Sequence, residues 1–155
     1  MDNAALIDQY EAGPAEVRDA LAGITDDELD RRPEPGAWTA REVVHHLADS
    51  EATSYIRLRR MLAIDGAEIQ SYDEAAWAAE PRLAYDGPIE PPLAVLEAVR
   101  AATTGVLRRL DDADLSRPGF HPEHDNYSVQ IWLEIYAEHA HIHAEQIRRA
   151  RQGMP

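Results

Sequence analysis

Apolar residues recur every three or four positions along four long stretches of the chain, and this spacing restricts its fold more than any other feature. The stretches cover roughly residues 2–23, 39–64, 91–110 and 128–151. Such spacing places apolar side chains on one face of a helix, whereas a half-buried strand alternates apolar and polar residues. No convincing alternation is present. The pattern predicts an all-α fold, a four-helix bundle whose helices bury their apolar faces against one another.

Residues near the ends of these stretches are typical of helix ends. Thr39 and Glu42 have the spacing of a capping box, and Ser128 is a suitable N-cap for the last helix. Within the first stretch, Gly13-Pro14 should kink or break the helix, because proline has no amide hydrogen to donate. We therefore expect three uninterrupted long helices and one that is kinked or divided.

A long connection, from about Asp65 to Glu90, joins the second and third stretches. It is longer than most connections in compact domains. It can therefore travel back along the second helix, so that the third helix runs parallel to the second, as in bundles with one long crossover. The alternative is a surface loop without fixed contacts. The crossover is favoured because a short extra helix fits near Tyr72–Trp77 and apolar anchors are available at Trp77, Leu83, Tyr85 and Ile89.

Composition excludes several classes of function. The 155 residues suit one domain, 1–155, and 29 acidic against 15 basic residues give a formal charge of −14 that disfavours nucleic acid. Without cysteine there is no disulfide, thiolate metal site or cysteine nucleophile, and without lysine no Schiff base. No apolar run approaches the ~20 residues of a membrane helix, and no signal-peptide pattern is visible. We expect a cytoplasmic protein that does not contact membranes.

Three of the seven histidines are placed to share one metal ion. The predicted buried face of the last helix includes Ile135 and Ile142, and His139 and His143 lie one turn apart on it. His46 lies at the edge of the buried stripe of the second helix, in line with Ser50. Imidazole ligands suit divalent zinc or nickel. Three protein ligands with a free position are typical of a catalytic site, whereas structural sites close with a fourth ligand.

The other histidines have more ordinary explanations, and the H-x-x-x-H pair itself is often a plain surface or core feature. We expect His45, His124 and His141 to be solvated. His121 belongs either to a hairpin that approaches the metal or to a simple turn, and the turn is favoured.

Carboxylates give a poor signal for a general base. Glu138 is positioned to orient a ligand imidazole, and His121 and Ser50 are further candidates behind the ligands or on the substrate side. Most such acids on helices are simply solvated. The chain has no H-E-x-x-H motif, no glycine-rich phosphate loop and no nucleophile elbow.

Several segments in order resemble the YfiT-like branch of the DinB superfamily, over about Thr25 to Ile147. These segments read GAWTAREVVHHLADSEATSYIRLR, YDEAAW, FHPEH and LEIYAEHAHIHAEQI. The resemblance implies a four-helix bundle with up-down-down-up topology, usually a homodimer, and a metal held by three histidines. The implied ligands are the second histidine of HHLAD, His46, and the pair His139 and His143, which the helical faces also select.

The resemblance also narrows the activity. Relatives include metal-dependent hydrolases and thiol S-transferases that attach bacillithiol or mycothiol to electrophilic small molecules. Glu51 and Gln146 stand where such relatives carry histidine, and we expect no counterpart of their N-terminal arm, which leaves the substrate and the dimer geometry open.

Three functional hypotheses remain at this point. The first is a metal-dependent enzyme, with thiol transfer slightly favoured over hydrolysis because a metal-bound thiolate needs no general base. The second is a non-catalytic metal- or small-molecule-binding protein, such as a stress-response dimer. The third, DNA binding, is opposed by the acidic charge.

Overall fold

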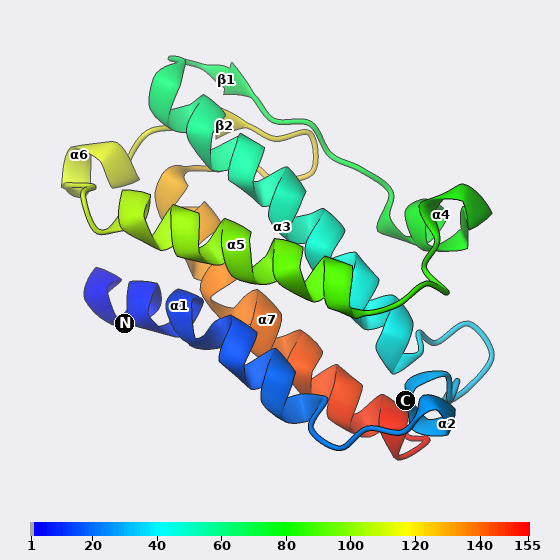
Figure 1. The fold of residues 1–155 in the computed structure, drawn as a ribbon. Helices are drawn as coiled ribbons and strands as arrows, with labels where there is room; N and C mark the ends of the chain where they lie inside the picture. The colour runs from blue at the N-terminus through cyan, green and yellow to red at the C-terminus, as the bar shows by residue number, and fades with distance from the viewer. Residues whose placement is uncertain (1) are drawn as a thin grey trace.

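Four long helices form the computed structural model, which describes residues 2–155 (Figure 1). They are α1 (Asn3–Ala20), α3 (Ala40–Ala63), α5 (Glu90–Leu107) and α7 (Val129–Arg151). In Figure 1, α1 and α7 run in one direction while α3 and α5 run in the other. The predicted four-helix bundle with up-down-down-up topology is confirmed. Within residues 2–155, no helix combines the length and the apolar character that a membrane span requires.

Short elements join the long helices. They are α2 (Asp26–Leu29), α4 (Glu74–Ala79), the 3₁₀ helix η1 (Pro81–Leu83) and α6 (Asp112–Leu115), with the strands β1 (Ala67–Glu68) and β2 (Gly119–Phe120). The strands pair in parallel, with Ala67 opposite Gly119. A strand pair of two residues is too short to give an alternating pattern, so the sequence did not predict it. The helix α4 confirms the short extra helix expected in the crossover.

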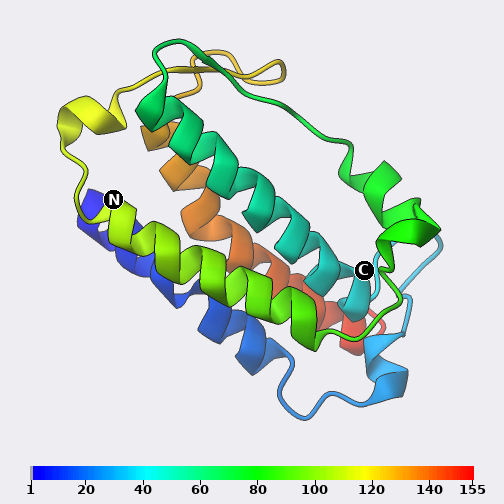
Figure 2. The same cartoon turned by 45° about the horizontal axis from the view of Figure 1, so that its top comes forward.

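The connection between α3 and α5 travels back along α3, as the crossover prediction required (Figure 2). Ile69 and Tyr85 anchor it, because both are buried and the Tyr85 hydroxyl donates to Asp49 Oδ2 at 2.8 Å. The expected anchors Trp77 and Leu83 are instead exposed. The crossover is therefore fixed to the bundle, but partly by residues other than those that the apolar pattern suggested.

The buried face of α7 consists of both large and very small side chains. Trp132 is fully buried and its indole donates to the Ser54 carbonyl, while Ala140 and Ala144 are also fully buried. Ile135 and Ile142, which the sequence placed on this face, are exposed instead. Large apolar residues were a misleading guide here, because alanines let the neighbouring helix approach closely and leave the isoleucines on the flanks.

The helix α1 is not broken at Gly13-Pro14, contrary to one of the two expected outcomes. Pro14 leaves the Tyr10 carbonyl without its intrahelical donor. The Arg100 guanidinium replaces that donor, with Nη1 donating to the Tyr10 carbonyl at 2.6 Å. A Cβ at Gly13 would lie 2.4 Å from Arg100 Nη1, so the glycine makes room for the guanidinium. A side chain from α5 thus supplies the hydrogen bond that proline removes from α1.

Arg100 also joins the other long helices. Its Nε and Nη2 donate to Glu51 Oε1 at 2.9 and 2.6 Å, and Nη2 donates to the Tyr136 carbonyl at 2.9 Å. Both members of this ion pair are almost completely inaccessible to solvent. Because a buried charge is costly unless its hydrogen bonds are satisfied, the pair holds all four helices in one relative position.

Candidate metal centre

Three imidazoles from α3 and α7 come together inside one end of the bundle. One ring nitrogen from each of His46, His139 and His143 lies within 4.8 Å of the other two. His139 and His143 face the same side because they are one turn apart on α7, and their ring centroids are 4.5 Å apart. His46 faces them from α3, with centroid distances of 5.5 Å to His139 and 4.7 Å to His143.

All three imidazoles are neutral at ordinary pH. Burial, together with the neighbouring His143, lowers the pKa of His46 to about 3. Burial likewise lowers the pKa values of His139 and His143. A neutral imidazole has one unprotonated nitrogen, so each ring offers a lone pair to a cation.

A neighbouring amide determines which nitrogen of His143 is free. His143 Nδ1 lies 2.7 Å from Gln146 Oε1, and an amide oxygen can only accept, so Nδ1 carries the hydrogen. The lone pair of His143 is therefore on Nε2. Such a contact behind a ligand fixes its ring and raises its basicity. The sequence marked Gln146 only as a departure from the relatives and did not predict this contact.

The donor set fits a divalent metal ion. His46 Nδ1 and His139 Nδ1 are buried and have no hydrogen-bond partner among residues 2–155. Unpaired buried nitrogens are unfavourable, and a metal ligand needs no hydrogen-bond partner. Ligands about 2.1 Å from a tetrahedral ion lie about 3.4 Å apart, so small ring rotations would close this cluster around one ion.

A cavity of about 630 Å³ adjoins the cluster, and His139 lines it together with Ser50, Tyr72, Glu74 and other residues. Glu74 Oε2 lies 3.7 Å from His46 Nε2, too far for a hydrogen bond but next to the ligand set. The Tyr72 hydroxyl is buried without a hydrogen-bond partner in the described residues. Neither residue was predicted from the sequence, although both lie in the YDEAAW segment, because the crossover shows no helical periodicity.

The remaining predicted site residues lie in different places. Ser50 is buried one turn after His46 and lines the cavity. His121 lines it too, from a turn in which His121 and His124 form an isolated bridge. Glu138 is exposed and lies outside the cavity lining.

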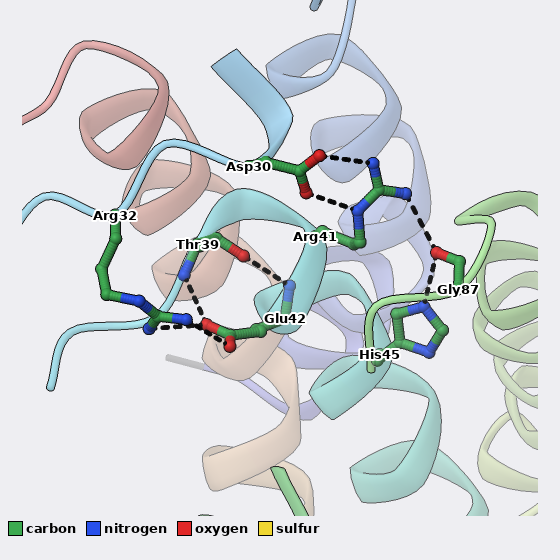
Figure 3. A network of polar contacts seen from close by, with 7 residues as sticks. All are labelled: Asp30, Arg32, Thr39, Arg41, Glu42, His45 and Gly87. Carbon is green, nitrogen blue, oxygen red and sulfur yellow. Dashed lines mark hydrogen bonds and ion pairs between the residues drawn. The ribbon is translucent and has the colours of Figure 1, made fainter. Parts of the chain in front are cut away.

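Two histidines expected to be solvated are partly buried. His45 Nε2 lies 3.2 Å from the Gly87 carbonyl and its ring stacks on Tyr85, because the end of the crossover covers that side of α3 (Figure 3). His141 Nε2 lies 2.9 Å from the Gln9 carbonyl of α1. His124 is exposed, as expected.

A capping box and contacts with two flanking segments hold the start of α3, the helix that carries His46 (Figure 3). Thr39 and Glu42 form the predicted capping box. Arg41 binds both carboxylate oxygens of Asp30 and also donates to the Gly87 carbonyl. Contacts from both flanking segments therefore fix the position of the helix two turns before its ligand histidine.

Comparisons with known proteins agree on one family. A family model described as the DinB superfamily matches residues 9–147. The chain is 34% identical over 149 residues to "Putative metal-dependent hydrolase YfiT" of Bacillus subtilis, covering 96% of this chain and 83% of that one. It is also 34% identical over 141 residues to "Putative metal-dependent hydrolase OB0782" of Oceanobacillus iheyensis, covering 91% and 81%.

A solved structure has the same fold. It is described as "YfiT from Bacillus subtilis is a probable metal-dependent hydrolase with an unusual four-helix bundle topology". The TM-score is 0.89 at 33% identity, and the match covers 99% of this chain and 89% of that one.

Proposed function

The chain belongs to the DinB superfamily, and from that membership and its three-histidine cluster we propose that it is a divalent-metal-dependent enzyme acting on small molecules. The proposed ligands are His46, His139 and His143, and zinc or nickel suits them. The observation that carries the proposal is the convergence of three neutral imidazoles beside a cavity of about 630 Å³. A cavity of this size suits a small-molecule substrate.

We propose hydrolysis as the reaction. When bound, a divalent ion supplies Lewis acidity, which polarises a carbonyl and lowers the pKa of a water or thiol at the open position. Glu74 is the proposed general base: its carboxylate takes the proton from the attacking water and returns it to the leaving group. Thiol transfer was preferred from the sequence because no base was found near the cluster. Since the Glu74 carboxylate lies beside His46, hydrolysis no longer lacks a base.

Tyr72 is the proposed donor to the developing oxyanion. Burial raises the pKa of its hydroxyl, so the proton stays on the oxygen at neutral pH. The hydroxyl has no other hydrogen-bond partner within residues 2–155 and borders the cavity that holds Glu74 and His139. A fixed donor of this kind favours the transition state over the ground state.

Thiol transfer is the second candidate, and the volume of the cavity supports it. About 630 Å³ is enough to hold a small thiol beside an electrophile. A low-molecular-weight thiol such as bacillithiol or mycothiol would be the co-substrate. This reaction would need no base, because a divalent ion held by the three histidines would keep the thiol deprotonated.

Turnover with matched variants separates the two reactions. Metal-free protein is reloaded with zinc or nickel and assayed with p-nitrophenyl acetate, and with bacillithiol or mycothiol plus an electrophilic dye. For a hydrolase, we expect Glu74→Gln to lower kcat by about 10²- to 10⁴-fold and Tyr72→Phe by about 10²-fold. For a thiol transferase, Glu74→Gln should leave conjugation nearly unchanged.

Loss of a ligand should remove either activity. His139→Ala is expected to abolish turnover, whereas His141→Ala, on the same helix but outside the cluster, and Glu138→Gln should retain it. Full metal loading without turnover of thiols, esters or amides would contradict the enzyme and favour a binding protein.

A further inference from the structure

Arg57 has a half-buried side chain and no acidic partner among residues 2–155, in a chain with 29 acidic residues and 15 arginines. Its Nε and Nη2 donate to the main-chain carbonyl of Gln70 at 3.1 and 2.7 Å. In the part of the chain that the structure describes, it forms no ion pair with a carboxylate. The crossover therefore holds this cation in place without neutralising its charge.

The Arg57 side chain lines the same cavity as His139, Glu74 and Ser50. Arg57 follows His46 by eleven residues, which places its Cα about 16 Å further along α3. Long side chains on a helix lean toward its N-terminus, so we expect the Arg57 side chain to shorten this separation from the cluster. Arg57 and His46 are thus separated along α3, while Arg57 and His139 line the same cavity.

The charge of Arg57 acts on the interior of the cavity. Burial raises the pKa of the Tyr136 and Tyr127 hydroxyls, and the positive charge of Arg57 opposes that rise at both. The acidic residues of the cavity, Asp73, Glu74 and Glu123, are exposed. The cavity therefore combines a partly desolvated cation inside with carboxylates at its rim.

We propose that Arg57 binds a carboxylate of the substrate, so that the enzyme acts on small molecules with an anionic group several ångströms from the reacting bond. Gln70 occupies the edge of the guanidinium formed by Nε and Nη2. The other edge, formed by Nη1 and Nη2, can donate two parallel hydrogen bonds to a carboxylate. The assignment of a reacting bond rests on the proposed function, whereas the anion site does not.

Binding of glutarate to the zinc-loaded protein tests the anion site without turnover. One carboxylate of glutarate would meet Arg57 while the other faces the metal end of the cavity. By calorimetry, we expect Arg57→Gln to weaken glutarate binding by about 10- to 100-fold, and Arg57→Lys by less, because lysine keeps the charge but not the fork. Arg60→Gln is the matched control, since Arg60 lies on α3 outside this cavity.

Three results would overturn the proposal. They are no binding of glutarate to the unchanged protein, equal affinity in Arg57→Gln, and tighter Arg57-dependent binding of inorganic phosphate than of glutarate. The circular dichroism spectrum and zinc content of Arg57→Gln must match those of the unchanged protein, so that a folding defect is recognised.

Hydrolysis of an anionic ester and of its neutral counterpart tests whether the anion site serves the proposed reaction. Mono-p-nitrophenyl glutarate carries a free carboxylate, and p-nitrophenyl pentanoate is its neutral counterpart. We expect Arg57→Gln to raise KM for the anionic ester about 10-fold or more with little change in kcat, and to leave the neutral ester unaffected. If neither ester is hydrolysed but glutarate binding still depends on Arg57, the hydrolase is refuted and the anion site stands.

Discussion

Three imidazoles meet inside the bundle because His139 and His143 are one turn apart and His46 faces them across the interface of α3 and α7. Helical spacing was sufficient to select these residues from seven histidines. Of the residues around them, the sequence selected Ser50 and His121, which line the adjoining cavity, but not Gln146, Glu74 or Arg57. Gln146 contacts His143 from one turn further along the same helix, whereas Glu74 reaches the histidines only because the crossover returns along α3 (Figure 2), and no periodic pattern marks that return.

Gln146 should strengthen metal binding through His143. In Gln146→Leu the ring loses the acceptor for its Nδ1 hydrogen, and both its tautomer and its orientation become free. We expect zinc affinity to fall by about 10- to 100-fold in a chelator competition assay. Gln130→Leu, at a position about 24 Å from Gln146 along α7, should bind zinc as the unchanged protein does. Unchanged affinity in Gln146→Leu would show that the amide does not orient the ring.

At the scale of the helices, a hydrogen bond from α5 to α1 replaces one that α1 lacks. Proline at position 14 removes a donor that the Tyr10 carbonyl needs, and Arg100 supplies it from another helix. The sequence marked Gly13-Pro14 as a disruption, because local rules describe what proline removes. They cannot show that a guanidinium from a residue 90 positions away replaces the lost hydrogen bond.

Breaking the buried pair on one side should be more harmful than its net contribution suggests. Glu51→Leu leaves the Arg100 charge buried without its partner, and we expect it to lower the free energy of unfolding by about 3–5 kcal/mol. Glu51→Leu combined with Arg100→Met should cost less than the sum of the two single changes. Urea unfolding of the metal-free proteins measures this coupling, and additive effects would contradict it.

Pro14→Ala tests more sharply whether Arg100 replaces the donor that proline removes from the Tyr10 carbonyl. In the Arg100→Met background it restores an amide donor for the Tyr10 carbonyl, so it should raise the free energy of unfolding by about 1 kcal/mol or more. With Arg100 present, that carbonyl already has a donor and the gain should be smaller. Equal gains in both backgrounds would show that Arg100 does not serve the carbonyl that proline leaves unpaired.

At the scale of the whole molecule, the sequence predicted the fold class, the four long helices and the crossover. Amphipathic spacing and connection length determine those features directly. It placed Ile135 and Ile142 in the core wrongly, since alanines rather than isoleucines face the neighbouring helices. It also predicted wrongly that His45 and His141 are solvated, because the segments that cover them come from elsewhere in the chain.

The homodimer that the family resemblance implies stays a prediction. Light scattering of the purified protein would test it, with a mass of about twice 17.3 kDa expected.

X-ray absorption of the zinc-loaded protein tests the central claim most directly, because it reports the ligands of the ion itself. The account predicts one zinc per chain, with three imidazole nitrogens at about 2.0–2.1 Å and a further light atom at the open position. His139→Ala should lose one imidazole and most of its affinity, while His141→Ala should give the spectrum of the unchanged protein. Zinc bound without imidazole ligands, or with equal affinity in His139→Ala, would contradict the account.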